Sequence, residues 1–124
     1  MKKILIVGMN PRRIDFSQPG FLPGLTAEKV LMGLKAERES LKEAGCDSDM
    51  YLVDTGVLEL SPLVEQLKAR QFDGIMLGAG LRIPPSNFIL FEKIINTVHE
   101  NAPGTRIIFN TNPYDTKESI GRWL

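Results

Sequence analysis

The chain has 124 residues and lacks several features that commonly identify a class of protein. It contains a single cysteine, Cys46, so no disulfide can form within it, and a single histidine, His99. These two residues lie far apart in the sequence, which supports neither a cysteine–histidine catalytic pair nor a classical zinc site. No apolar stretch approaches the roughly 20 residues that are needed to span a membrane.

An excess of charge of one sign is also missing. The 15 basic and 15 acidic residues give a net charge of zero, which argues against a dedicated nucleic-acid-binding or membrane-surface protein. Lys2 and Lys3 precede an apolar run, but this run ends after about six residues and is shorter than the roughly 7–15-residue core of a signal peptide. With 43% apolar and 24% charged residues, we expect one globular domain over residues 1–124, located in the cytoplasm.

Short apolar segments alternate with amphipathic ones along the whole chain. The segments expected to form strands are Lys3–Val7, Met50–Val53, Gly74–Leu77 and Arg106–Phe109. Near-continuous apolar strands that alternate with helices predict a parallel sheet with helices on both faces. Right-handed crossovers favour the strand order 2-1-3-4, as in a flavodoxin-like or Rossmann-like three-layer α/β sandwich.

Capping residues place the expected helices between these strands. The helices are expected over about 27–44, from Ser61 with Pro62 at the first position, from Ser86 to about Glu100, and from Asp115. Thr26 is suited to cap the first helix and Gly45 to end it in a left-handed conformation. Asp115 begins an acidic variant of the capping box. On the third helix, Phe88 is expected to face inward with its apolar neighbours.

The connection between the first strand and the first helix is the most informative segment. It spans the seventeen residues Gly8–Gly24, whereas such connections usually take roughly 2–6 residues. A long loop of this kind normally persists for a functional reason. In a doubly wound sheet, ligands bind beyond the carboxyl ends of the strands, where the strand order reverses. We therefore expect the functional site there.

Four connections reach that end of the sheet: the long loop, Asp54-Thr55-Gly56, Gly78–Pro85 and Asn110–Asp115. Arginine forks match the oxygens of carboxylates and phosphates, and a glycine-rich backbone can form an anion-binding concavity. These residues predict binding of an anionic small molecule that bears a phosphate or carboxylate. The expected ligand-binding residues are Asn10, Arg12, Arg13, Asp15, Asp54, Gly78, Gly80, Arg82, Asn110 and Asn112. The arginines would hold the charge, the glycines would let the ligand approach, and the asparagines with Asp15 would orient it.

Structural roles are the alternative for the same residues. Arg12 and Arg13 can be solvated or can pair with Asp15 and Asp54, and asparagines commonly cap their own turns. Asp54 ends a strand at the position where Rossmann proteins place an acid on a ribose, but the accompanying glycine fingerprint is absent. The sequence therefore argues against a dinucleotide site, and it names no cofactor and no metal.

Two resemblances to known families add to this interpretation. The whole chain, and especially KILIVGMNPRRIDF, FDGIMLGAGLRIPP, LFEKIINTVHENAP and RIIFNTNP, resembles a group of small uncharacterised bacterial Rossmann-like proteins. That resemblance implies the fold and the interest of the strand-end loops, but no activity.

The second resemblance is local. The residues Ile6–Pro11, followed by Phe16, look like the first motif of mismatch-specific uracil-DNA glycosylases, and Phe109–Pro113 looks like their second motif. By this resemblance, Asn10 would match the asparagine that positions the attacking water, and Phe16 would match the aromatic residue that stacks on a flipped base. A hydrolase of this kind is the second functional hypothesis.

The edges of the sheet suggest a third hypothesis. In the order 2-1-3-4, the second and fourth strands are edge strands, and edge strands either are covered or pair with another chain. A homodimer is therefore plausible, including a structural or regulatory homodimer that takes no small ligand. Whether the chain is an enzyme stays open from the sequence alone.

Overall fold

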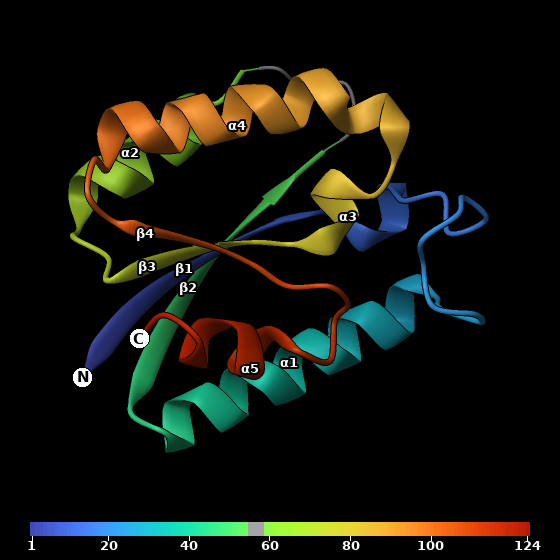
Figure 1. Ribbon diagram of the computed structural model, residues 1–124, viewed down its shortest axis with the longest axis horizontal. Coiled ribbons are helices and arrows are strands. Elements are labelled where there is room, and N and C mark those ends of the chain that lie inside the picture. Colours follow the sequence, from blue (N-terminus) through green and yellow to red (C-terminus); the bar gives the residue numbers. More distant parts are fainter. Residues whose placement is uncertain (55–58) are drawn as a thin grey trace.

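The computed structural model describes residues 1–54 and 59–124 and contains one four-stranded parallel sheet in the order β2-β1-β3-β4. The strands are β1 (Lys2–Met9), β2 (Cys46–Val53), β3 (Gly74–Leu77) and β4 (Arg106–Phe109). Helices cover both faces of the sheet, so the predicted three-layer α/β architecture and strand order are confirmed (Figure 1). Thr55 and Gly56, which belong to the second expected strand-end connection, lie outside the described residues.

The central strand β1 carries the core on both faces. Leu5 and Val7 belong to the apolar cluster on the side of α2 (Ser61–Ala69) and α4 (Phe88–Asn101). Ile4 and Ile6 alternate with them and pack on the other face. All four side chains are buried. This two-residue alternation explains why the strand reads as an uninterrupted apolar run in the sequence.

The opposite face of the sheet is covered by α1 (Ala27–Glu43) and α5 (Thr116–Gly121) (Figure 1). Both predicted ends of α1 are confirmed. The hydroxyl of Thr26 accepts a hydrogen bond at 3.2 Å from the backbone N–H of Lys29, and Gly45 has φ of +88°. These two ends fix where the long loop enters α1 and where β2 begins.

Several predicted boundaries are wrong. β2 begins at Cys46 rather than Met50, because an edge strand that pairs only with β1 can carry polar residues that do not look like a buried strand. The segment expected as a Gly78–Pro85 loop contains the single-turn helix α3 (Ala79–Arg82), and its last residue begins the 3-10 turn η2 (Pro85–Asn87). As a result, α4 begins at Phe88 rather than at Ser86.

Phe88 was predicted to face inward, but its side chain is 66% exposed. The inward face of α4 is formed instead by Leu90, Ile94 and Val98. The helix begins two residues later than expected. Phe88 is therefore the first residue of α4, on its exposed side rather than on the side that packs on the sheet.

Two predicted caps are also wrong. Leu60, not Ser61, is the residue before α2, and the Ser61 hydroxyl bonds to the carboxylate of Glu59 at 2.6 Å. Asp115 precedes α5 without capping it, because its carboxylate accepts hydrogen bonds from the preceding residues Thr111 and Asn112. In the described parts of the chain, no helix has the length and apolar character that crossing a membrane requires.

Candidate functional site

A cavity of about 80 Å³ lies at the carboxyl ends of β1 and β3. Val7 and Met9 of β1 supply its floor, together with Gly78, which follows β3, and Gly80 of α3. In the order β2-β1-β3-β4 this is the position where the strand order reverses, which is where doubly wound sheets bind their ligands. The cavity therefore occupies the place in the fold where the sequence predicts a site.

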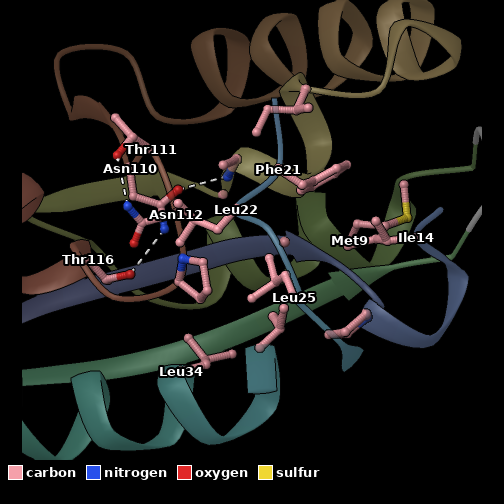
Figure 2. A pocket seen from close by; sticks show the side chains of 18 of the residues that line it. Met9, Ile14, Phe21, Leu22, Leu25, Leu34, Asn110, Thr111, Asn112 and Thr116 are labelled. Atoms are coloured by element: carbon pink, nitrogen blue, oxygen red, sulfur yellow. Dashed lines mark hydrogen bonds between the residues drawn. The ribbon is translucent and has the colours of Figure 1, made fainter. Parts of the chain in front are cut away.

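Apolar side chains of the long loop and of α1 cover the cavity. They come from both halves of the loop and from the first two turns of the helix: Ile14, Phe16, Phe21, Leu22, Leu25, Val30 and Leu34. Phe16 and Phe21 meet edge to face, with ring centroids 5.2 Å apart. The long loop thus acts as an apolar cover over the strand ends (Figure 2).

Few hydrogen bonds hold this cover in place. Among the described residues, the hydrogen bonds within the segment from Asp15 to Leu25 are local, such as that from the Leu25 N–H to the Leu22 carbonyl at 3.2 Å. The one that reaches another element runs from the Lys29 ammonium to the Gly24 carbonyl at 2.9 Å. Because apolar contacts rather than a hydrogen-bonded ladder hold the loop, its outward displacement breaks little beyond those contacts.

The polar wall of the cavity is formed by the connection after β4, where Asn110, Thr111, Asn112 and Thr116 gather opposite Met9 and Ile14 (Figure 2). The Asn110 side chain is buried, and both of its polar atoms are used. Its carbonyl oxygen accepts from the Ala79 N–H at 2.7 Å, and its amide donates to the Thr116 hydroxyl at 3.1 Å. Asn110 therefore joins three chain segments at the cavity wall.

Asn112 and Thr111 are held in a compact turn beside Asn110. The Asp115 carboxylate accepts from the Thr111 hydroxyl at 2.5 Å and from the Asn112 N–H at 3.2 Å. The side-chain oxygen Oδ1 of Asn112 accepts from the Tyr114 N–H at 2.8 Å. This turn presents a rigid polar edge to the cavity.

A second polar cluster lies at the end of β1. The side-chain oxygen Oδ1 of Asn10 accepts from the Arg12 N–H at 3.1 Å and so caps the 3-10 turn η1 (Pro11–Arg13). Its amide donates to Asp54 at 3.0 Å, and the Arg13 guanidinium lies 3.7 Å from the same carboxylate. The structure thus brings together Asn10, Arg13 and Asp54, and the contact of Arg13 with Asp54 is the structural alternative that the sequence left open.

Arg12 and Asp15 have other partners. The Arg12 guanidinium pairs with Glu28 at the start of α1, at 2.9 Å. The pKa of Glu28 is lowered, mainly by a hydrogen bond from its own backbone N–H and then by Arg12. Asp15 accepts from the hydroxyl and the N–H of Ser17, and these bonds lower the pKa of Asp15. The Arg12–Glu28 ion pair and the hydrogen bonds between Ser17 and Asp15 are all exposed.

Arg82 is not among the residues that line the cavity. Its guanidinium donates to the Asn110 backbone carbonyl at 3.0 Å and lies 5.8 Å from the centre of the Phe109 ring. Within the described residues, the buried Nη1 atom has no hydrogen-bond partner. The three predicted arginines therefore do not converge on one point.

The glycines allow a close approach of the chain at the cavity. A Cβ atom on Gly80 would lie 2.8 Å from Cδ1 of Ile14, so the loop packs directly against the backbone of α3. Gly20, inside the loop, has φ of +102°, a conformation that other residues rarely adopt. Replacing either glycine would displace the cover.

Of the ten predicted site residues, Gly78, Gly80, Asn110 and Asn112 line the cavity. The sequence reasoning missed the apolar lining, which is the larger part of the site. A signal was present, because Ile14, Phe16 and Phe21 are large apolar residues in a loop that would otherwise be polar. Such residues need a surface to pack against, and here they pack over the strand ends.

The cavity is suited to binding. No charged side chain is found among its described lining residues, and no group of three or more acidic, histidine or cysteine residues suited to a metal ion exists within residues 1–54 and 59–124.

Comparison with known proteins adds no relative, since no family model matches the chain and no significant match was found among curated proteins or solved structures. Function has to be inferred from the geometry of the site.

Proposed function

We propose that the protein binds a small organic anion, with its apolar body in the cavity under the long loop and its charged group at the rim. The apolar cavity at the switch point of the sheet carries this proposal. Apolar cavities in proteins stay dry and take up apolar molecules. Ligand sites are mostly apolar, with a few polar groups that fix the orientation of the ligand.

The size of the cavity limits the ligand. At about 80 Å³ it is smaller than the roughly 150 Å³ that accommodates benzene in an engineered cavity. A ligand with one ring, or a short branched chain, therefore requires the long loop to move outward. The loop is suited to this movement because mainly local hydrogen bonds and apolar contacts hold it.

The charge of the ligand is inferred from Arg12 and Arg13. Both residues lie in the turn between Pro11 and Ile14, which line the cavity. Their present partners, Glu28 and Asp54, form exposed ion pairs, and exposed pairs contribute little to stability. A carboxylate or phosphate on the ligand can therefore replace either partner at small cost, whereas an inorganic anion would not fill the apolar interior.

Isothermal titration calorimetry with benzoate, benzyl alcohol and inorganic phosphate tests this proposal. We expect benzoate to bind, benzyl alcohol to bind about tenfold more weakly because it lacks the charge, and phosphate not to bind. The variant Val30→Phe should abolish binding because Val30 lines the cavity. The matched control Met32→Phe, at an exposed position of the same helix, should bind normally. Equal binding by both variants would contradict the proposal.

A base-releasing hydrolase is the second candidate. One observation favours it: the two segments that resemble motifs of mismatch-specific uracil-DNA glycosylases meet at the same cavity, since Phe16 and Asn112 both line it. Asn10 itself holds η1 and Asp54 rather than lining the cavity. An assay of uracil release from a mismatched duplex tests this candidate, and release no faster than in the blank would remove it.

A further inference from the structure

The hydrogen bonds of Asn110 decide which role the Thr116 hydroxyl plays on the polar wall of the cavity. The backbone N–H of Ala79 can only donate, so the end of the Asn110 side chain that faces it, at 2.7 Å, is the oxygen. The other end is then the amide, which donates to the Thr116 oxygen at 3.1 Å. Because an amide nitrogen accepts no hydrogen bond, the hydrogen of the Thr116 hydroxyl is left for another acceptor.

That hydrogen finds no acceptor among residues 1–54 and 59–124. In this part of the chain, the Thr116 hydroxyl takes part in a single side-chain hydrogen bond, and it does so as the acceptor. Thr116 is only 1% exposed, so bulk water does not reach it, but it does line the cavity. A buried donor without an acceptor is costly. The acceptor therefore has to come from the molecule that occupies the cavity.

Asn112 offers a second donor on the same wall (Figure 2). Its side-chain oxygen accepts from the Tyr114 N–H at 2.8 Å, which identifies the other end of the side chain as the amide. One amide hydrogen is directed at the Thr111 hydroxyl at 3.3 Å, and within the described residues the second has no acceptor. Thr111 adds no donor of its own, because its hydrogen goes to the Asp115 carboxylate at 2.5 Å.

The two donors lie across the cavity from the arginines. Figure 2 shows Thr116 and Asn112 opposite Ile14, and η1, which carries both Arg12 and Arg13, ends directly before Ile14. Apolar side chains line the space between these two sides. A carboxylate placed against the neutral donors would lose its hydration without gaining a cation, which is costly. The group that suits them is an uncharged acceptor.

We infer that the ligand carries a neutral hydrogen-bond acceptor, such as a ketone or amide carbonyl, at the end opposite its anionic group. The Thr116 hydroxyl and the Asn112 amide bind this acceptor, while the anionic group stays at the rim. This inference rests on the proposed function and narrows its ligand class, because an organic anion with a purely apolar body would leave both donors unpaired. Thr116 and Asn112 are thus the residues that determine specificity.

Two probes of matched shape test the inference by isothermal titration calorimetry. 4-Acetylbenzoate carries a carbonyl oxygen where 4-isopropenylbenzoate carries a CH₂ group, and apolar contact alone would favour the second compound. We expect the acetyl compound to bind about fivefold more tightly, as pairing an unsatisfied buried donor does. Equal binding, or tighter binding of the isopropenyl compound, would overturn the inference and leave the proposed function standing. No binding of either compound or of benzoate would overturn both.

Variants of Thr116 identify the donor. Thr116→Val removes the hydroxyl at nearly constant volume and should abolish the preference for the acetyl compound, whereas Thr116→Ser should retain it. Thr97→Val is the matched control, because the Thr97 hydroxyl bonds only to the Lys93 carbonyl of its own helix, and it should also retain the preference. An unchanged preference in Thr116→Val would overturn the inference.

Infrared spectroscopy of the wild-type protein decides the matter without a variant, should Thr116→Val fail to fold. The probe is 4-acetylbenzoate with an isotope label in its ketone carbonyl. Because a hydrogen bond weakens a carbonyl bond, we expect the stretching frequency of the bound ketone to lie below its value in an apolar solvent. A frequency equal to that in the apolar solvent would overturn the inference.

Discussion

The side-chain carbonyl of Asn110 accepts a hydrogen bond at 2.7 Å from the backbone N–H of Ala79, 31 residues earlier in the chain. The amide end of the same side chain donates to Thr116 at 3.1 Å. One buried side chain therefore fixes the connection after β3 relative to the connection after β4. These two connections form the floor and the polar wall of the cavity.

Asn110→Ala should lower the free energy of unfolding by about 2–3 kcal/mol, because it leaves the buried Ala79 N–H and the Thr116 hydroxyl without their partner. Urea unfolding measures this loss. Asn96→Ala is the matched control, since the exposed Asn96 side chain only bonds to a carbonyl of its own helix, and it should change stability by less than about 0.5 kcal/mol. Equal effects would show that Asn110 does not hold the two connections together.

Gly33 and Tyr114 predict a coupling between α1 and the last connection. A Cβ atom on Gly33 would lie 2.9 Å from Cε1 of the Tyr114 ring and 3.3 Å from the Pro113 carbonyl. Gly33→Ala should therefore destabilise the protein, although alanine is favoured over glycine in a helix by about 1 kcal/mol. In a Tyr114→Ala background the same change should cost about 1 kcal/mol less. A cycle of four unfolding measurements tests this, and additive effects would contradict the contact.

The cross-strand pair Lys3–Asp47 predicts a sensitivity to acid. These residues are opposite each other in the register of β1 and β2, and their charged groups lie 2.8 Å apart. The pKa of Asp47 is lowered from 3.8, first by the hydrogen bond from Lys3 and then by its charge. Because the folded pKa is the lower one, this stabilisation is complete above the unfolded pKa and is lost as the pH falls through the folded value.

A side-chain NMR titration follows this carboxyl group directly. In Lys3→Met, the pKa of Asp47 should rise toward its ordinary value, and the stability of the variant should decline less than that of the wild type on acidification. Lys2→Met is the control, because the Lys2 ammonium bonds to the Leu124 carbonyl instead. An Asp47 pKa that is the same in wild type and Lys3→Met would show that the pair does not act in solution.

The Arg12–Glu28 pair predicts opposite effects of two substitutions on ligand binding. Glu28→Gln removes the carboxylate that competes for Arg12 and should tighten benzoate binding about twofold to fivefold, the range expected from breaking an exposed ion pair. Arg12→Gln should weaken it. The control Glu39→Gln, farther along α1, should leave the affinity unchanged. If both Arg12→Gln and Glu28→Gln bind as the wild type does, Arg12 does not contact the anion.

The sheet could be predicted from the sequence because the apolar pattern of each strand and the residues that end each helix are properties of short segments. β3 and β4 have the predicted boundaries, and Thr26 and Gly45 mark the ends of α1 by their own chemistry. β2 was underestimated because the residues Cys46–Asp49 are polar, and only pairing with β1 makes them a strand. Phe88 was misplaced because the sequence did not reveal the 3-10 turn η2, so the start of α4, and with it the buried side of the helix, was set two residues too early.

The place of the cavity could be anticipated from the sequence, but the character of its lining could not. The unusual length of the Gly8–Gly24 loop is visible in the sequence, and it indicates the carboxyl end of the first strand as the place of interest. The path of the loop decides that Phe16 and Phe21 cover the strand ends while Arg12 turns to Glu28. That path depends on long-range packing, so the sequence overstates the charge of the site and understates its apolar lining.

The most direct test of ligand binding under the loop is a methyl NMR titration of the protein with benzoate. Binding in the cavity predicts saturable shifts of the methyl groups of Ile14, Leu25 and Val30, which line it, with little change at Leu63 and Ile94 in the opposite core. Absence of saturable shifts at the lining methyl groups, or shifts confined to other parts of the molecule, would contradict the proposed function.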